Sequence, residues 1–359
     1  MKKFSKIITT MFMLAVIVIS GAMLVGCGEK DFDKSKISIG QTSFTYDGNS
    51  HIYEVTYEDE KDVIVKYSLD GENFVDKENI NLKNVGIYTL YFKLSLEGYN
   101  DYTGNEKVGI KGFEAITQST VSSFANFADA MANVQNNGTI KMFDNVELTQ
   151  PLAISKSITL NGQGKYNIKA SDSFAGGNIL EIETADITVT LKDVNINANQ
   201  KARIAYVEAG KLVVDGAVLE NGYRADTYAY GVYITKSASF EMISGSIKGH
   251  QKEADTEYTK KYCADLWIGA NANGVINGGE IENMFINANS YSQTNPGKVT
   301  VNGGKIYNAY VEYGNGYGAK LEFKGGEIMT LRISTTESNG NFVVVSPIIN
   351  TTYVGGVTE

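Results

Sequence analysis

The chain has 359 residues, enough for two domains and a sizeable core. Its 22 Tyr, 15 Phe and 37 Gly, with only 3 Pro, favour strands joined by glycine turns, so we expect an all-β protein. The formal net charge of -9 argues against a nucleic-acid partner, because such binding depends on Lys and Arg neutralising phosphates.

Residues 1–26 are predicted to be an export signal. Three lysines precede an apolar run that ends in the letters LVGC (24–27). Basic residues, then an apolar run, then small residues are typical of a secretory signal peptide. The alternative is a single transmembrane helix, for which the run is just long enough.

The letters LVGC also resemble the lipobox of bacterial lipoproteins. This resemblance implies that Cys27 receives a diacylglycerol on its thiol and becomes the first residue of an exported, lipid-anchored cell-surface protein. Two or more acyl chains anchor a protein stably, whereas one does not. Residues 27–35 would then form a tether. Cys263 is the only other cysteine, so we expect no intramolecular disulfide and no cysteine metal cluster.

Residues 36–112 are predicted to form an antiparallel β-sandwich of about seven strands, because short alternating stretches are separated by Asp-Gly turn signals. The segments FTYDG (44–48), YSLDGENF (67–74) and GYNDYTG (98–104) resemble the immunoglobulin-like modules with a Tyr-Asp-Gly signature in bacterial surface proteins. The resemblance implies a spacer that holds the rest of the chain away from the membrane.

One helix is predicted between residues 119 and 138. Its apolar side chains recur at helical spacing, at Phe124, Phe127, Met131 and Val134. We expect Ser122 or Ser123 as the N-cap and Gly138 at the end. Because the apolar stripe needs a partner, we interpret this helix as a cap on the first coil of the strands that follow.

From about residue 139 the sequence repeats. The last apolar residues of the successive copies are Ile196, Leu219, Ile247, Ile281, Ile306 and Ile328, at intervals of 23, 28, 34, 25 and 22. This period predicts a β-solenoid. The segments GTIKMFDNVELTQPLAISKSITLNGQG (138–164) and YGVYITKSASFEMISGSIKG (230–249) resemble right-handed parallel β-helix surface proteins of the pectate-lyase-like class, and the resemblance covers residues 117–359.

Paired glycines mark the same place in these copies. Gly278-Gly279, Gly303-Gly304 and Gly325-Gly326 correspond to Ser244-Gly245 and Gly216-Ala217 in earlier copies. No Lys-Ser or Lys-Thr follows them, so they are not phosphate-binding loops. We expect a tight turn with positive φ and little room for side chains.

Aligning the copies predicts an aromatic column on the outside of the stack. Val207, Ile234, Ile268, Ile286, Val311 and Ile333 form one inward column, and the residues two positions earlier form another. The residues between the two inward columns must point outward: Tyr206, Tyr233, Trp267, Phe285, Tyr310 and Arg332. A polar outward column follows: Glu208, Thr235, Gly269, Asn287, Glu312 and Ser334.

Such a column could bind a carbohydrate chain, because ring faces stack on sugars while polar neighbours bond the hydroxyls. Arg332, Glu312 and Asn287 would add directed hydrogen bonds. The alternative is purely structural, since aromatic residues stabilise strands by pairing across them. Both interpretations stay open at this point.

Two insertions precede the aromatic strand, at residues 220–231 and 248–265, and could wall the column on one side. Their polar candidates are Tyr223, Arg224, Asp226, His250, Tyr258 and Asp265. Taken singly, each of these is more ordinarily a solvated loop residue.

Enzymes of the pectate-lyase-like class use clustered aspartates for calcium, or paired aspartates for hydrolysis. Asp193 and Asp215 are one residue out of register, and Glu181 precedes Tyr206 in the outward column without forming a recognisable pair. No catalytic signature carries over, and only His51 and His250 are present, so we expect no zinc site and no cofactor. Calcium has no support in the sequence.

The sequence therefore predicts an all-β surface lipoprotein: an N-terminal immunoglobulin-like β-sandwich, then a right-handed parallel β-helix with a short N-terminal capping helix. We expect a non-enzymatic protein that binds glycans or host proteins through the β-helix, with membrane lipid as the partner of Cys27. The alternatives are a polysaccharide lyase or glycosidase, and a structural stalk.

Overall fold

A computed structural model describes most of the chain, in these segments: 29–58, 62–222, 229–249, 263–288, 295–314, 317–334, 342–345, 348–349 and 353–355. The chain divides between Lys111 and Gly112 into two compact units, which are treated separately below. No helix in the described segments is both long and apolar enough to cross a membrane. The predicted signal segment and the lipobox residue Cys27 lie outside them.

The first unit is built from two sheets. A two-stranded ribbon pairs β1 (Ile37–Ile39) with β3 (Val55–Tyr57), and a four-stranded sheet has the order β2 (Ser43–Thr45), β6 (Tyr102–Lys111), β5 (Gly86–Ser95), β4 (Ile64–Ser68). Two 3-10 turns, η1 (Lys34–Lys36) and η2 (Lys77–Asn79), lie outside the sheets.

Alternation along β5 explains the core of this unit. Leu90, Phe92 and Leu94 are buried, while the residues between them are more exposed, as expected for a strand with one face on a core. The described strands are fewer than the seven we expected, and β2 pairs with β6 in parallel rather than antiparallel. The prediction of a wholly antiparallel sheet was therefore wrong.

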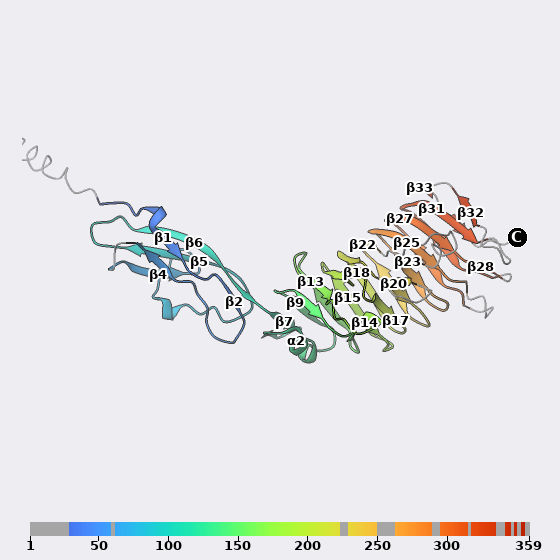
Figure 1. The fold of residues 1–359 in the computed structure, drawn as a ribbon, viewed down its shortest axis with the longest axis horizontal. Coiled ribbons are helices and arrows are strands. Elements are labelled where there is room, and N and C mark those ends of the chain that lie inside the picture. The colour runs from blue at the N-terminus through green and yellow to red at the C-terminus, as the bar shows by residue number, and fades with distance from the viewer. Residues whose placement is uncertain are drawn as a thin grey trace, which may run out of the picture. The chain divides into compact units, whose positions relative to one another are not determined.

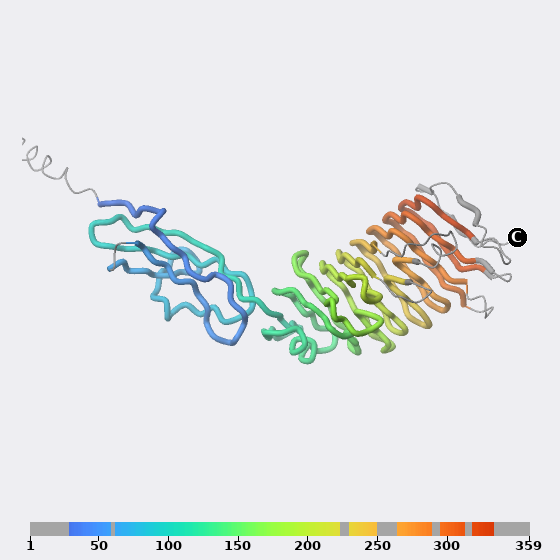
Figure 2. Tube along the Cα trace, viewed as in Figure 1, coloured from blue at the N-terminus to red at the C-terminus, as the bar shows by residue number. Residues whose placement is uncertain are grey.

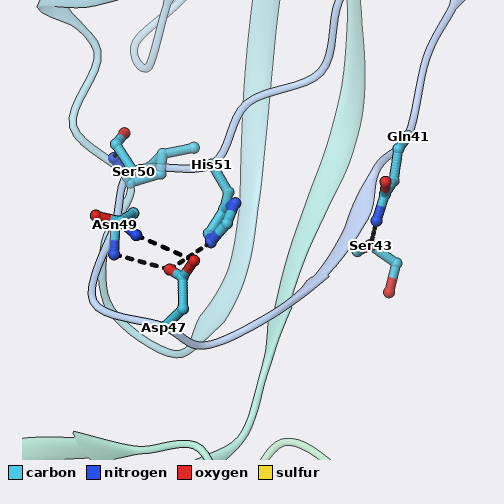
Figure 3. A network of polar contacts seen from close by, with 7 residues as sticks. Gln41, Ser43, Asp47, Asn49, Ser50 and His51 are labelled. Atoms are coloured by element: carbon cyan, nitrogen blue, oxygen red, sulfur yellow. Dashed lines mark hydrogen bonds and ion pairs between the residues drawn. The ribbon is translucent and has the colours of Figure 1, made fainter.

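In both Asp-Gly turns of this unit, the aspartate side chain accepts hydrogen bonds from the residues that follow it. Asp47 accepts hydrogen bonds from the backbone N–H and the side chain of Asn49, and its Oδ1 lies 2.8 Å from His51 Nε2 (Figure 3). The Asn49 backbone bond, followed by the Asn49 and His51 side chains, lowers the pKa of Asp47 to about 2. Asp70 makes the same kind of turn with Glu72 and Asn73, and the hydrogen bond from the Ser68 hydroxyl, followed by those from Asn73 and Glu72, lowers its pKa as well.

The second unit opens with a hairpin and a helix. The strands β7 (Phe113–Ile116) and β8 (Val121–Phe124) pair antiparallel, and β7 also pairs antiparallel with β9 (Gly138–Met142). The helix α2 spans Phe127–Asn133, shorter than expected, with Asn126 rather than a serine as the N-cap. Our N-cap prediction was wrong because Ser122 and Ser123 lie within β8, where pairing with β7 outweighs helix propensity.

The helix still covers the apolar start of the stack. Phe127, Ala130 and Val134 belong to the same buried cluster as Ile140 of β9, and the Phe113 and Phe127 rings meet edge to face, 5.5 Å apart. Lys156 Nζ donates to the carbonyl oxygen of Val134 at the helix end. The edge of β9 is closed by the β7–β8 hairpin, so helix and hairpin share the capping role that we assigned to the helix alone.

The rest of the second unit is a helix-like stack of parallel strands, whose successive coils lie side by side in Figure 1 and can be followed along the trace in Figure 2. One sheet takes a strand from each coil: β9, β12 (Ile158–Asn161), β15 (Thr188–Lys192), β18 (Lys211–Asp215), β21 (Ser239–Met242), β24 (Asn273–Ile276), β26 (Lys298–Val301) and β30 (Lys320–Phe323), closed by antiparallel β34 (Tyr353–Gly355).

The other large sheet bends around a corner and has two arms. The first arm contains β10 (Val146–Leu148), β13 (Asn167–Ala170), β16 (Asn195–Asn197), β19 (Ala217–Glu220) and β22 (Gly245–Lys248). The second arm contains β11 (Leu152–Ala153), β14 (Asn178–Ile182), β17 (Arg203–Val207), β20 (Ala229–Ile234) and β23 (Cys263–Ile268).

Three longer strands run through both arms: β25 (Glu280–Ile286), β27 (Lys305–Val311) and β31 (Glu327–Ser334). Thus β25 pairs with β22 through its first half and with β23 through its second. The short strands β32 (Phe342–Val345) and β33 (Ile348–Ile349) pair antiparallel with β31, and β28 (Tyr313–Gly314) pairs with β29 (Tyr317–Gly318).

The predicted register of the coils is confirmed. Each residue of the anchor series is paired with the next one along the stack: Ile196, Leu219, Ile247, Ile281, Ile306 and Ile328. All six are fully buried. The two inward columns of the second arm are also buried, in the same apolar cluster. The isoleucine pattern alone therefore located the core of the stack.

The paired glycines form the predicted tight turn. Gly279, Gly304 and Gly326 have φ of 84°, 87° and 92°, a region that side chains rarely adopt. A Cβ on Gly304 would lie 2.7 Å from the carbonyl oxygen of Gly279, which belongs to the neighbouring coil. The residues after them, Glu280, Lys305 and Glu327, alternate in charge along the stack, and Lys305 Nζ lies 3.6 Å from Glu327 Oε2.

Candidate functional site

The outward aromatic column exists in the predicted register. Parallel pairing joins Glu181 to Tyr206, and then continues through the column: Tyr206, Tyr233, Trp267, Phe285, Tyr310 and Arg332. Trp267, Phe285 and Tyr310, with Tyr233 packed against them, belong to a cluster separate from the interior of the stack. The prediction that they project away from the coil interior is therefore confirmed.

The exposure of this column differs from our expectation. Phe285 is 0% exposed, and Trp267 and Tyr310 are each 5% exposed. The Trp267 and Phe285 rings stack at 3.8 Å between centroids with an interplanar angle of 15°. Three of the six predicted ligand contacts are therefore packed side chains, and the expected open strip along the whole column was wrong. Coil alignment gives the direction of a side chain but not what lies over it.

Tyr206 and Tyr233 form the open end of the column. Both are partly exposed, and their ring centroids lie 5.7 Å apart with the planes at 49°. Tyr230 lies behind them, 4.9 Å from Tyr233 and 4.1 Å from Trp267 between centroids. The buried rings thus hold the two accessible tyrosines in place.

Arg203 and Tyr230 are buried against this open end, 8% and 7% exposed, and were missed from the sequence. The Arg203 guanidinium lies 5.3 Å from the centroid of the Tyr233 ring and 5.5 Å from that of Tyr230, in cation–π geometry. Strict alternation would turn both residues inward. A signal was present in the sequence, because Ile204 and Ala205 are consecutive apolar residues, and in the structure both are buried where alternation breaks at this corner.

Polar groups border the two tyrosines. Asn178 is paired in register with Arg203, and its Nδ2 donates to Glu181 Oε1 at 2.9 Å. Burial is the main cause that raises the pKa of the Tyr206 hydroxyl above its ordinary value, with Tyr233 adding to it. The hydroxyl therefore remains a neutral hydrogen-bond donor at neutral pH. We name these five residues, Asn178, Glu181, Arg203, Tyr206 and Tyr233, the tyrosine platform.

Much of the predicted polar column is engaged within the protein. Asn287 Nδ2 donates to Glu312 Oε2 at 2.7 Å, and Glu208 forms an ion pair with Lys236. Arg332 lies over the Tyr310 ring, with 5.3 Å between its guanidinium carbon and the centroid. These predicted ligand contacts therefore interact with other side chains of the protein itself.

Asp265, an insertion candidate, is 1% exposed and lies at the corner of the large sheet. Its Oδ2 accepts a hydrogen bond of 2.8 Å from Asn283, whose Oδ1 accepts one of 3.0 Å from Asn308. These bonds form a ladder from Asp265 through Asn283 to Asn308 on successive coils. Arg224 and Asp226, with Tyr223, His250 and Tyr258, lie outside the described residues.

The described segments contain no group of three or more His, Cys, Asp or Glu side chains that could hold a metal ion. Asp193 and Asp215 lie in turns, where Asp193 N donates to the Asp215 carbonyl oxygen and Lys192 pairs with the Asp215 carboxylate at 3.7 Å. These carboxylates are one residue out of register, as predicted.

Comparison with known proteins yields no match to any family model, curated protein or solved structure. The functional argument therefore rests on the geometry of the stack.

Proposed function

We propose that this protein is a non-catalytic, lipid-anchored surface protein that binds a glycan chain at the tyrosine platform. The observation that carries this proposal is the pair of partly exposed rings, Tyr206 and Tyr233, held by packed aromatics beside a guanidinium and a carboxylate. Ring faces of this kind stack on the C–H surfaces of sugars. The partly exposed Glu181 and Tyr206 hydroxyl supply an acceptor and a donor for sugar hydroxyls, while the buried Arg203 holds the Tyr233 ring.

The finer description of the fold is part of the same proposal. We assign the first unit to the immunoglobulin-like modules and the stack to the right-handed parallel β-helices of the pectate-lyase-like class. Parallel pairing in register through every coil supports the second assignment. A crystal structure of the full chain would test both, and a left-handed coil would contradict the second.

The test of the glycan site is a binding screen of the full chain on a glycan array. Tyr206→Ala combined with Tyr233→Ala should weaken binding to the preferred glycan by about tenfold or more, because each lost ring forfeits stacking of roughly 0.5–1.5 kcal/mol in addition to its contact area. Tyr206→Phe combined with Tyr233→Phe, which keeps the rings, should retain most of the affinity.

Tyr307→Ala provides the matched control, since Tyr307 is 39% exposed on the part of β27 before the corner. It should leave glycan binding unchanged. Equal binding by the intact chain and the double alanine variant would contradict the platform. Release of new reducing or unsaturated sugar ends would instead favour the lyase or glycosidase alternative.

Lipid attachment is tested at the only two cysteines of the chain. We expect cells fed a radiolabelled fatty acid to label the wild-type chain, and Cys27→Ser to lose the label, because the thiol is the acceptor of the diacylglycerol. Cys263→Ser should retain the label. A labelled Cys27→Ser variant would contradict the lipobox assignment.

A structural stalk is the second candidate function. It is favoured by the burial of Trp267, Phe285 and Tyr310, which stabilises the stack without offering a surface to a ligand. The array screen separates the two, because a stalk binds no glycan while its stability still depends on those rings.

A further inference from the structure

A groove lies on the large sheet that does not carry the tyrosine platform, at the turns that lead into β21, β24 and β26. Its volume is about 500 Å³, within the usual range of small-ligand sites. It is lined by Lys236, Ser237, Asn271, Asn273, Asn295, Pro296 and Lys298. Six of these seven residues are polar and none is acidic, in a chain whose net charge is -9.

The row of residues at the start of these strands ends in two adjacent lysines. Lys211, Ser239, Asn273, Lys298 and Lys320 are paired in register on successive coils. Lys298 and Lys320 are both exposed, and neighbouring strands lie about 4.8 Å apart. Like charges directly opposite each other destabilise a sheet, so this pair costs free energy in the absence of a counter-charge.

Another lysine of the same row has a carboxylate partner. In the same row, Lys211 Nζ lies 2.6 Å from Glu241 Oε2, which is two residues beyond Ser239 on the next coil. For Lys298 the corresponding position is Glu322, two residues beyond its register partner Lys320 on the next coil. The ion pairs between described residues include no partner for Lys298 or Lys320.

The nearest carboxylate in sequence is already engaged. Glu322 is two residues beyond Lys320, but its Oε1 lies 3.0 Å from Lys324 Nζ and its Oε2 accepts a 3.2 Å hydrogen bond from Thr300. In the groove itself, Lys236 is paired with Glu208. Positive charge in excess therefore gathers at Lys298, which lines the groove next to Asn273, and at Lys320, its neighbour on the next coil.

We propose that this groove binds an anionic group, a sulfate ester or a carboxylate, carried by a sugar polymer. Lys298 in the groove and Lys320 beside it on the next coil supply the charge, and the amides of Asn271 and Asn273 supply neutral donors. Charge-assisted hydrogen bonds to such oxygens are stronger than neutral ones. The groove shares no residue with the tyrosine platform. Binding at the groove can therefore be tested independently of binding at the platform.

The test compares three polymers with one backbone: neutral dextran, carboxymethyl dextran and dextran sulfate, each passed over the immobilised full chain at low salt. We expect at least one charged polymer to bind and neutral dextran not to bind. Lys298→Gln with Lys320→Gln should weaken that binding about tenfold or more, from the loss of two charge-assisted contacts. Added salt should weaken it too.

Two further variants make the result specific to the groove. Lys169→Gln with Lys201→Gln removes the same charge from exposed positions elsewhere on the stack and should leave binding within about twofold, because surface changes away from a site have small effects. Asn273→Asp places a carboxylate beside Lys298 in register and should abolish binding.

Binding of dextran sulfate alone would identify the group as a sulfate ester, and binding of carboxymethyl dextran alone would identify it as a carboxylate. Binding of both would show that the groove accepts either group. The proposal is overturned if neither charged polymer binds, if neutral dextran binds equally, or if the control pair of lysines loses as much as the groove pair. Retained binding in the Tyr206→Ala, Tyr233→Ala variant would show that the groove acts without the tyrosine platform, and loss there would overturn their independence.

Discussion

Trp267→Ala is expected to lower the free energy of unfolding of the stack by about 3–5 kcal/mol, the usual cost of truncating a buried Trp or Phe. Trp267 is 5% exposed, stacked on Phe285 at 3.8 Å and 4.1 Å from Tyr230 between ring centroids. Its loss leaves a cavity that neighbouring coils, fixed by their ladders, cannot close. Urea unfolding followed by circular dichroism measures the effect, because the variant has no tryptophan to report fluorescence.

Tyr307→Ala is again the control, with an expected change within about 0.5 kcal/mol for an exposed side chain. An unchanged urea midpoint for Trp267→Ala would contradict the packed arrangement and restore an open aromatic strip along the whole column. A loss of glycan binding in Trp267→Ala is therefore not evidence of contact with the ligand until its stability is known.

Gly304→Ala is expected to destabilise the stack by about 3 kcal/mol. The left-handed conformation, with φ of 87°, costs a non-glycine residue roughly 1–2 kcal/mol. The new Cβ would also lie 2.7 Å from the Gly279 carbonyl oxygen and 2.8 Å from the Gly278 carbonyl carbon, and such overpacking costs about 1–3 kcal/mol. Both contacts are to backbone, which has little freedom to move away.

Gly164→Ala separates the two causes. Gly164 also has a positive φ, 68°, but a Cβ there would meet no atom within 4 Å. This variant should cost only the conformational part, roughly 1–2 kcal/mol. Equal urea midpoints for the two variants would contradict the claim that close approach between coils, as well as φ, requires glycine at position 304.

The register of the stack was predictable because it depends on local repetition. An aliphatic residue, isoleucine in every copy but the one with Leu219, recurs once per coil at the same place after a turn, and stacking must bury every member of that series. The same regularity located the aromatic column. Each of these properties is fixed by a residue and its equivalent one coil away.

Burial of the column was not predictable in this way. Whether Trp267 and Tyr310 face solvent depends on everything above the sheet, whereas alignment of coils specifies only what lies beside them. Arg203 was missed because two consecutive inward residues at a corner reverse the alternation. The helix start was misplaced because Ser122 and Ser123 suit an N-cap locally but are taken into a strand by long-range pairing with β7.

The strand β25 pairs through one continuous run with both β22 and β23, although 14 residues separate those two strands in the sequence, from 249 to 262. Coil length can therefore vary at this corner while the ladders on either side remain in phase. The ladders fix the positions of the paired strands, and the segment that connects them can differ in length and sequence. A surface segment could therefore be inserted or exchanged at this corner during evolution without changing the buried residues of the core.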